Sequence, residues 1–419
     1  MSRRRLLFLA HRIPYPPEKG EKIRAWHMLD HLANRWDVEL GFLAEDEADL
    51  AHLPVLRRRC TAVHWGMMPR RGGMAALRAL MRTRPGQPLT LGWFHHPGLA
   101  AWVEAGLANG RYDAVFAYSS AMAPYVMGPA ARPHGPGPWC VLDMVDVDSE
   151  KWMAYAATAR APMRQVWARE ARTLLAFERR AATAFERTIL VSREEAERFA
   201  ALAPEVAPRL AWVDNGVDLA RFDPAQPYPD PYGGAGARAI VFTGTMNYRP
   251  NVEAVCWFAA EVMPLLRAQS KGPPPEFHIV GANPAPSVQA LARLPGVHVT
   301  GTVPDVRPYL AHAAVAVAPL GIARGIQNKV LEAMAMARPV VASPQAFEGV
   351  RAVPGRHLLV AEGTEETTRR VAEVLDGAHP ELGLAGRAAV MAGHDWAATL
   401  AQLDPLLEPE AAAVTMAAQ

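Results

Sequence analysis

The sequence predicts an α/β protein built from two doubly wound parallel sheets. Short apolar runs alternate with helical periodicity along the 419 residues, a pattern typical of parallel sheets covered by helices on both faces. The alternation falls into two series that meet near residues 214–218. A chain of this length also has room for two cores, because one domain usually takes about 150 residues. We therefore expect two Rossmann-like units.

The first series opens with an apolar strand at residues 6–10 (LLFLA), followed by a helix at 22–33. Further strands are expected at 38–44, 114–120, 139–145 and 187–192, with helical periodicity at 122–127 and 194–202. The basic residues before the first strand do not make a secretory signal, because the apolar run is short and no small-residue cleavage site follows it.

The second series opens with a strand at 239–245 (AIVFTGT) and a helix over 251–269. Strands at 277–282, 297–303, 315–320 and 339–343 then alternate with helices at 287–294, 306–313 and from residue 327 or 328. The Pro/Gly-rich residues 222–237 are typical of a surface connection. We expect domains at 1–212 and 213–395, a helix at 396–407 that returns towards the first domain, and a flexible tail at 408–419.

Charge and cysteine content restrict the class of protein. The net charge of +2 argues against a general polyanion binder, and three widely spaced cysteines fit a reducing compartment. No segment approaches the ~18 uninterrupted apolar residues of a membrane span. We expect a cytoplasmic protein.

One segment is strongly basic and amphipathic. Residues 57–84 contain Arg57, Arg58, Arg59, Arg70, Arg71, Arg78, Arg82 and Arg84 among methionines, leucines and a tryptophan. No acidic residue follows until Glu104. This composition suits attachment to anionic lipid at the inner face of the cell membrane. A solvated face is the alternative, and nucleic acid fits poorly because the aromatic residues show no stacking pattern.

The stretch ARGIQNKVLEAMAMARPVVAS, residues 323–343, predicts an anion site. Gly325 lets backbone approach closely, and the helix that follows begins near Gln327 or Asn328. Its free amides and the positive end of its dipole favour an anion. Arg324 and Lys329 add full charges beside it.

Glu332 lies within the apolar part of the same helix. Its carboxylate could accept two hydrogen bonds from adjacent hydroxyls, such as those of a ribose. Alternatively, Glu332 pairs with Lys329 at i,i+3 and has no further role.

Several motifs of the second half resemble retaining glycosyltransferases of family 4, which have the GT-B fold. They are the stretch above, NGVD at 215–218, FTGTMNYRPNVEAVCWF, FHIVGANPAPSVQALA, VHVTGTVPDVRPYLAHAAVAVAPL and HDWAATL. In the first half, HRIPYPPEKGEKIRAWHMLDHLA and DMVDVDSEKW resemble sugar transferases of PEP-CTERM/exosortase exopolysaccharide systems. The resemblance implies two Rossmann-like domains that face each other across a cleft.

The resemblance also implies roles for single residues. Glu332 matches the second glutamate of the family's pair, which holds the nucleotide ribose, whereas the first glutamate is replaced by Arg324. The family has an Arg and a Lys after the first strand of the nucleotide domain. Neither is present here, since the only basic residue in that loop, Arg249, does not lie at the position of the family's residues. Arg324 and Lys329 are the candidates that supply the missing charge. The implied donor-binding residues are Gly244, Arg249, Val303, Pro304, Gly325, Ile326, Asn328 and Glu332.

On the amino-terminal side, Gly20 matches the glycine of the first strand-to-helix loop, where a diphosphate and sugar approach a helix start. The expected catalytic residues are Gly20, Arg324, Lys329 and Asp146. The expected acceptor-side residues are His11, Lys19, Ser119, Ser120 and Asp148. Asp146 and Asp148 could instead bind a divalent cation, and Asp148 could cap the next helix.

The function implied is transfer of a sugar from a nucleoside-diphosphate sugar to a lipid-linked polysaccharide, with retention of configuration and without a metal or other cofactor. The nucleotide sugar and the acceptor are the expected partners, together with an anionic membrane surface and no nucleic acid. Two alternatives share the fold: a nucleotide-sugar epimerase and a non-catalytic sugar-nucleotide-binding protein.

Overall fold

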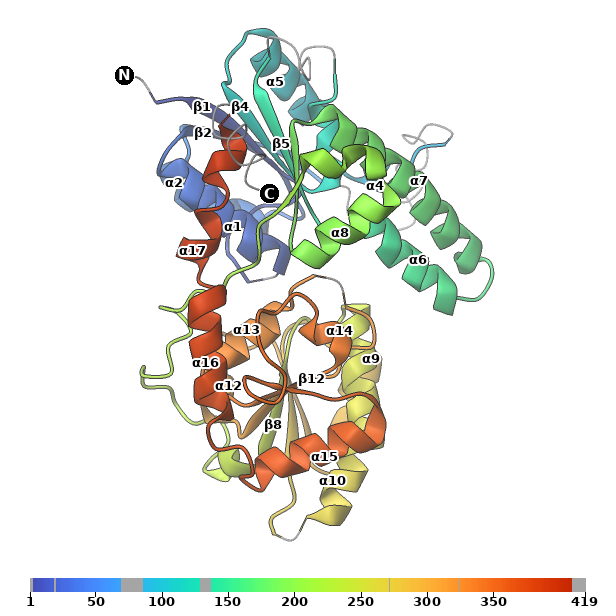
Figure 1. Cartoon of the computed structure of the whole chain (residues 1–419), viewed down its shortest axis with the longest axis vertical. Helices are drawn as coiled ribbons and strands as arrows, with labels where there is room; N and C mark the ends of the chain where they lie inside the picture. Colours follow the sequence, from blue (N-terminus) through green and yellow to red (C-terminus); the bar gives the residue numbers. More distant parts are fainter. Residues whose placement is uncertain are drawn as a thin grey trace. The chain divides into compact units, whose positions relative to one another are not determined.

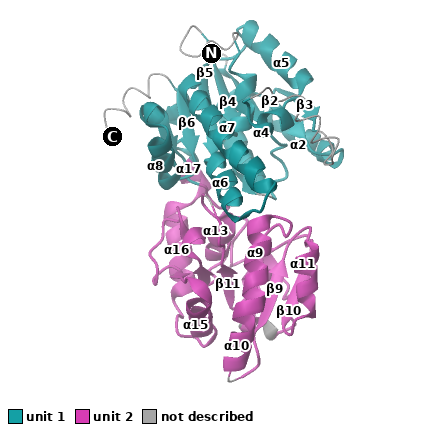
Figure 2. Ribbon diagram, turned by 90° about the vertical axis from the view of Figure 1, so that its right-hand side faces the viewer, with its two compact units in different colours: residues 1–214, 400–419 teal, residues 215–399 magenta. Residues whose placement is uncertain are grey.

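The computed structural model describes residues 3–18, 20–68, 86–128, 137–270, 272–323 and 325–408. The chain forms two compact units (Figure 2). Unit 1 comprises Met1–Asp214 and Leu400–Gln419, and unit 2 comprises Asn215–Thr399. Each unit is built on one parallel sheet, so the predicted α/β class with two Rossmann-like sheets is confirmed.

Unit 1 has a seven-stranded sheet in the order β3-β2-β1-β4-β5-β6-β7. Its strands are β1 (Arg5–Ala10), β2 (Asp37–Ala44), β3 (Ala62–Met67), β4 (Ala114–Tyr118), β5 (Trp139–Val145), β6 (Arg187–Leu190) and β7 (Leu210–Trp212). The central strands are almost wholly apolar because helices cover both faces of the sheet. The edge strands β3 and β7 are only half-buried, so no apolar run predicts them.

The helices of unit 1 follow the strands in the expected alternation (Figure 1). They are α1 (Gly20–Ala33), α2 (Leu53–Arg59), α4 (Leu89–Trp93), α5 (Pro97–Ala108), α6 (Asp148–Thr158), α7 (Met163–Ala184) and α8 (Arg193–Leu202). The pair α6 and α7 forms a helical hairpin. Among the described residues, no helix is both long and apolar enough to cross a bilayer.

Unit 2 has a six-stranded sheet in the order β10-β9-β8-β11-β12-β13. Its strands are β8 (Ala239–Thr243), β9 (Glu276–Val280), β10 (Val297–Gly301), β11 (Val315–Ala318), β12 (Val340–Ala342) and β13 (Leu359–Val360). All neighbouring strands run parallel. Their carboxyl ends therefore lie at one edge of the sheet, where ligands bind in doubly wound folds.

Helices cover both faces of this second sheet. Figure 1 shows α12, α13 and α16 on one face and α9, α10 and α15 on the other. The helices are α9 (Arg249–Trp257), α10 (Met263–Gln269), α11 (Pro286–Ala290), α12 (Arg307–His312), α13 (Asn328–Ala335), α14 (Pro344–Phe347), α15 (Gly363–Leu375) and α16 (Leu382–Gly393). The helix predicted over 251–269 is divided by a π-helical stretch at Phe258–Val262.

The carboxy-terminal segment belongs to unit 1 from Leu400 onwards. Helix α17 (Trp396–Leu400) ends there, and a 3₁₀ turn follows at Asp404–Leu407. The side chain of Asp404 accepts a hydrogen bond from His31 Nε2 at 2.8 Å, and its other oxygen lies 2.7 Å from an Arg35 nitrogen. Trp139 Nε1 donates to the carbonyl of Leu406 at 2.9 Å. Unit 1 is therefore built from two separate parts of the chain.

Candidate functional site

The start of α13 lies at the carboxyl edge of the unit 2 sheet, after β11. Gly325 is buried and has a φ of +60°, a conformation that glycine adopts with little strain. The helix begins at Asn328, and the side chain of the preceding Gln327 makes no capping hydrogen bond. The first amides of an α-helix have no partner within the helix. This helix start can therefore bind an anion, as the sequence predicts.

Lys329 extends from the first turn of α13 towards the end of β8. Its Nζ donates a hydrogen bond of 2.6 Å to Asn251 Oδ1 and lies 4.1 Å from the centre of the Phe242 ring. Burial lowers the pKa of Lys329 to about 7. Near pH 7 the Lys329 side chain is therefore only partly protonated, and an anion bound beside it would favour the charged ammonium form.

The loop after β8 approaches this ammonium closely. A Cβ atom added to Gly244 would lie 3.2 Å from Lys329 Nζ and 2.8 Å from Asn251 Nδ2. A Cβ added to Gly281 would lie 1.8 Å from the carbonyl oxygen of Gly244. Two glycines thus permit the ends of β8 and β9 to approach closely. Asn251 Nδ2 donates to the carbonyl of Thr245 at 2.9 Å and fixes the same loop.

Glu332 lies one turn further along α13 and is half-buried. Burial raises the pKa of its carboxyl to about 7, although the positive charges of Arg221 and Lys329 oppose the shift. Within the described part of the chain, no hydrogen bond or ion pair of this carboxylate is found, and Lys329 donates to Asn251 instead. The simple i,i+3 pair of Glu332 with Lys329 is therefore not formed. Both groups remain available to a ligand.

A buried network holds the start of α13 against the beginning of unit 2. Asn215 Nδ2 donates to Asn328 Oδ1 at 3.3 Å. The carbonyl of Asn215 lies 3.0 Å from Nδ1 of His394, which is fully buried. The amide of Arg351 donates to the other ring nitrogen of His394 at 2.9 Å. The NGVD and HDW motifs thus meet in space and position Asn328.

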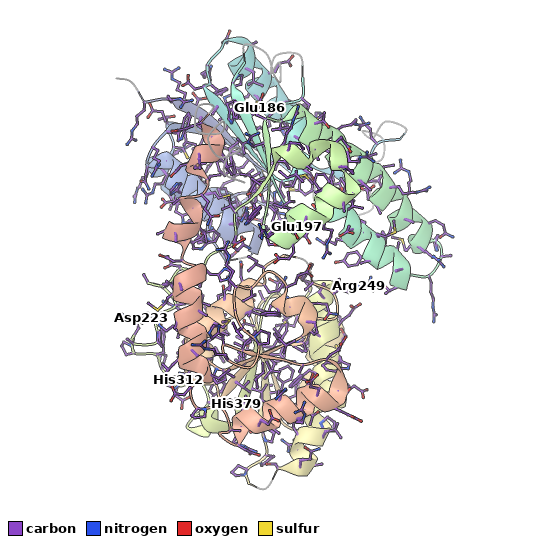
Figure 3. The ribbon with its side chains drawn as sticks, in the orientation of Figure 1. Glu186, Glu197, Asp223, Arg249, His312 and His379 are labelled. Atoms are coloured by element: carbon purple, nitrogen blue, oxygen red, sulfur yellow. The ribbon has the colours of Figure 1, made fainter. Side chains whose placement is uncertain are left out.

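The other expected donor-binding residues lie in unit 2 with different surroundings. The side chain of Ile326 packs in the core and the residue is 5% exposed, so only its backbone is available to contact a ligand. Arg249 opens α9 (Figure 3) and pairs with Glu253 at 2.6 Å. Val303 and Pro304 line a groove of about 730 Å³ with Tyr228, Arg307 and the Pro-rich connection at 226–231. The candidate donor site is therefore centred on the residues at the start of α13 and on the loop after β8: Gly244, Gly325, Asn328, Lys329 and Glu332.

In unit 1, α1 begins at the exposed Gly20, as the resemblance implies. The two cations that follow it are not solvated. Lys22 is buried and pairs with Asp49 at 3.3 Å. Arg24 is buried, donates through Nε to Asp143 Oδ2 at 2.9 Å and donates to the carbonyl of Val213 at 2.7 Å. Both cations support the fold and are not free for an anion at Gly20.

Three aspartates at the end of β5 and the start of α6 have different environments. Asp143, within β5, is completely buried and paired with Arg24, so it does not face a ligand. Asp146 Oδ1 is buried and has no hydrogen-bond partner among the described residues. Burial, followed by the charges of Glu195 and Asp148, raises its carboxyl pKa to about 7. Asp148 begins α6 and lies 4.0 Å from Lys151 Nζ.

The remaining acceptor-side residues lie at the same carboxyl edge of the unit 1 sheet. His11 stacks on Tyr118, with ring centres 5.7 Å apart, and burial lowers its pKa to about 4. Its imidazole is thus neutral at pH 7. Ser119 has a φ of 80° and its hydroxyl accepts a bond from the Ala121 amide. Ser119 and Ser120 are both buried, and the contact of Ser119 supports a role as a helix cap.

Two expected site residues, Lys19 and Arg324, lie outside the described residues, as do Arg70, Arg71, Arg78, Arg82 and Arg84 of the basic segment. Sequence reasoning missed Asn251, whose contact with Lys329 joins positions 78 residues apart. The only available signal for it was the GTMNYRPN motif itself.

Comparison with known proteins finds a family match within unit 2. Residues 237–376 match the family model described as glycosyl transferases group 1. No curated protein sequence matches the chain significantly.

Solved structures resemble the chain over nearly its whole length. They include Anabaena Alr3699/HepE in complex with UDP and glucose, at 14% identity and a TM-score of 0.67, with 96% of this chain and 99% of that chain covered. Sucrose-phosphate synthase from Thermosynechococcus elongatus has 17% identity and a TM-score of 0.68, with 96% and 98% covered. WaaG, a glycosyltransferase involved in lipopolysaccharide biosynthesis, has 15% identity and a TM-score of 0.65, with 96% and 100% covered.

The alignments with these structures include both units, which fits the two parallel sheets seen here. The family match covers most of unit 2, from just before β8 to the end of α15, and includes Lys329 and Glu332. The chain is therefore a glycosyltransferase with the GT-B fold, and its second unit carries the domain of glycosyl transferases group 1.

Proposed function

We propose that this glycosyltransferase moves a sugar from a nucleoside-diphosphate sugar to a polysaccharide or lipid-linked acceptor, with retention of configuration and without a metal. The observation that carries the proposal is the pairing of an uncapped helix start with the Lys329 ammonium beside Gly244. A diphosphate needs this combination of amides and positive charge. Glu332, which makes no hydrogen bond or ion pair among the described residues, is the residue that we propose to bind the ribose.

The proposed chemistry follows from the movement of charge. As the bond between the anomeric carbon and the diphosphate breaks, negative charge develops on the leaving oxygen. Lys329 and the α13 amides stabilise that charge, and such preorganised groups contribute several kcal/mol. The acceptor hydroxyl attacks the anomeric carbon and its proton passes to the leaving diphosphate. Asp146 is proposed to bind a sugar or acceptor hydroxyl, because its Oδ1 has no partner in the described structure.

We expect Glu332→Ala to weaken donor binding by about 1–3 kcal/mol, which is the order for hydrogen bonds to a charged group. UDP-glucose is the first donor to test, because a similar solved structure, Anabaena Alr3699/HepE, is a complex with UDP-glucose. Other bases and sugars complete the panel. Calorimetry measures the dissociation constant of each. Glu365→Ala, which removes an exposed carboxylate of α15, is the control. Equal affinities of wild type and Glu332→Ala would remove the ribose role.

We also propose that the protein is cytoplasmic and binds the inner surface of the membrane through the basic segment, residues 57–84. We propose that it acts within a PEP-CTERM/exosortase exopolysaccharide system. The support is the sequence motifs of the first half and the run of arginines. In the described part, Arg57, Arg58 and Arg59 are exposed on α2, and Arg59 pairs with Asp30 at 2.8 Å.

Replacing Arg70, Arg71, Arg78 and Arg82 with glutamine should reduce co-sedimentation with anionic liposomes, and salt should do the same, because the attraction is electrostatic. Donor binding should be unchanged. Replacing Arg293, Arg356, Arg369 and Arg370 of unit 2 removes the same charge and should leave co-sedimentation intact. If the wild-type protein does not co-sediment with anionic liposomes, the basic segment does not bring the enzyme to a membrane-bound acceptor.

The epimerase and non-catalytic alternatives predict different products. An epimerase alters the donor without an acceptor, whereas a binding protein consumes no donor. Donor consumption that occurs only when an acceptor is present would therefore exclude both the epimerase and the binding protein. Donor turnover measured with and without polysaccharide acceptor therefore tests the proposal as a whole.

A further inference from the structure

Three potential metal ligands lie together on the β9 and β10 strands of unit 2. Glu276 and His278 are two residues apart on β9, and His298 on β10 pairs directly with His278 in the parallel ladder. Side chains two apart on a strand and side chains of directly paired residues share one face of a sheet. The topology therefore directs Glu276, His278 and His298 to the same side.

The three ligand atoms are close enough to share an ion. Glu276 Oε2 lies 3.6 Å from His278 Nε2 and 3.4 Å from His298 Nε2. All three ligand atoms lie within 4.8 Å of one another. Bonds of about 2.0–2.2 Å in a tetrahedron place ligand atoms about 3.3–3.6 Å apart. Small side-chain rotations would thus complete the geometry. No other group of three such ligands occurs in the described ranges.

His278 provides the observation that points to a ligand. Its side chain is only 11% exposed, and Nε2 is buried without a hydrogen-bond partner in the described structure. The 3.6 Å separation from Glu276 is too long for a hydrogen bond. Buried ring nitrogens usually have a partner, because leaving one unsatisfied costs free energy.

Aromatic rings surround the His278 imidazole. The rings of His278 and His298 stack with centres 4.5 Å apart, and the Tyr232 ring meets the His278 ring edge-on, with centres 4.6 Å apart. These contacts hold the imidazole beside Glu276 and His298.

We propose that Glu276, His278 and His298 form a site for a divalent transition metal. Two imidazoles and one carboxylate suit Zn²⁺, Co²⁺, Ni²⁺ or Cu²⁺ better than Mg²⁺ or Ca²⁺, which take oxygen ligands. The side chains of Glu276 and His298 are 41% and 49% exposed, so water can complete the coordination.

The site serves the fold of unit 2 and not the transfer reaction. Glu276 begins β9 and His298 lies at the start of β10. The site is thus at the amino ends of these strands, opposite the edge where α13 begins. Because β10 is the edge strand of the sheet, an ion held by β9 and β10 ties that edge to its neighbour. Metal binding should therefore raise thermal stability without changing donor affinity.

The test uses full-length protein without a histidine tag. Co²⁺ titrated into wild type should give visible absorption that saturates at one ion per chain, and Zn²⁺ but not Mg²⁺ should displace it. His298→Ala should weaken binding roughly tenfold or more, the order for disturbing a metal site. Zn²⁺ should raise the melting temperature of wild type and not of His298→Ala.

His379→Ala is the matched control. His379 lies at the surface of unit 2 (Figure 3), half-buried, with Nε2 3.3 Å from Glu373 and with no third ligand in the described structure. This variant should bind Co²⁺ as wild type does. Glu276→Gln provides a second variant that leaves both imidazoles in place and should also weaken binding. The proposal is overturned by a wild type with no stoichiometric Co²⁺ site, or by equal binding in the His298→Ala and His379→Ala proteins.

Discussion

Replacing Lys329 with alanine is expected to slow sugar transfer by about 100- to 1,000-fold, which is the usual cost of removing one preorganised group from a developing negative charge. The reason is geometric, because Lys329 Nζ lies at the helix start beside Gly244 and no other described cation takes that position. Steady-state kinetics with donor and acceptor measure the loss. Lys329→Arg, which keeps a positive charge, should recover part of the rate if charge is the contribution.

The same assay distinguishes a metal-free site from one at Asp146 and Asp148. With Lys329 and the α13 amides neutralising the diphosphate, transfer should continue in excess chelator. If Asp146 and Asp148 held a catalytic cation, chelator would stop transfer, Mg²⁺ or Mn²⁺ would restore it, and Asp146→Asn or Asp148→Asn would mimic the loss. Parallel measurement of the His298→Ala variant distinguishes an effect of chelator on the transfer reaction from an effect on the proposed metal site at Glu276, His278 and His298.

Arg24→Met is expected to destabilise unit 1 by about 3–5 kcal/mol, because it leaves Asp143 buried without its partner. Both side chains are almost fully buried, at 1% and 0% exposure. Denaturant unfolding followed by tryptophan fluorescence measures the change, with the two units fitted as separate transitions. Arg24→Met combined with Asp143→Leu should recover much of the loss, since the pair is then replaced by apolar groups of similar size.

Arg179→Met is the matched control for Arg24→Met. Arg179 pairs with Glu205 at 2.7 Å, but the two side chains are 46% and 42% exposed. An exposed ion pair typically contributes 1 kcal/mol or less. A loss for Arg24→Met no larger than that of Arg179→Met would show that the buried pair is not what stabilises the end of β5.

The Arg24 pair also has a functional consequence. Asp143 Oδ1 accepts a hydrogen bond of 2.9 Å from the amide of Val145, a residue with a φ of 66°. This bond fixes the turn that presents Asp146. The Arg24→Met variant should therefore lose transfer activity even under conditions in which unit 1 remains folded.

The fold was predictable because its signals are local. Apolar strands and helical periodicity identify most elements of both sheets, and Gly325 with the residues after it identifies the start of α13. The edge strands β3 and β7 escaped because half-buried strands lack a continuous apolar run. The division of helix 251–269 by a π-helical stretch also has no simple sequence signal.

The chemistry of the site was less predictable because it depends on distant partners. Lys22 and Arg24 are near Gly20 in sequence, yet their partners lie 27 and 119 residues away. Asp143 and Asp146 are three residues apart, but one is ion-paired in the core and the other has an unpartnered oxygen. Only the packing of strands and helices decides which charged residue supports the fold and which can meet a ligand.

The two-part construction of unit 1 has a consequence for biosynthesis. Its last described contacts, made by Asp404 and Leu406, join residues near the carboxyl end to His31, Arg35 and Trp139. A ribosome makes the chain from the amino end, so all of unit 2 emerges before these contacts can form. Unit 2 can complete its sheet during translation as a contiguous segment, whereas the domain that starts first is finished last.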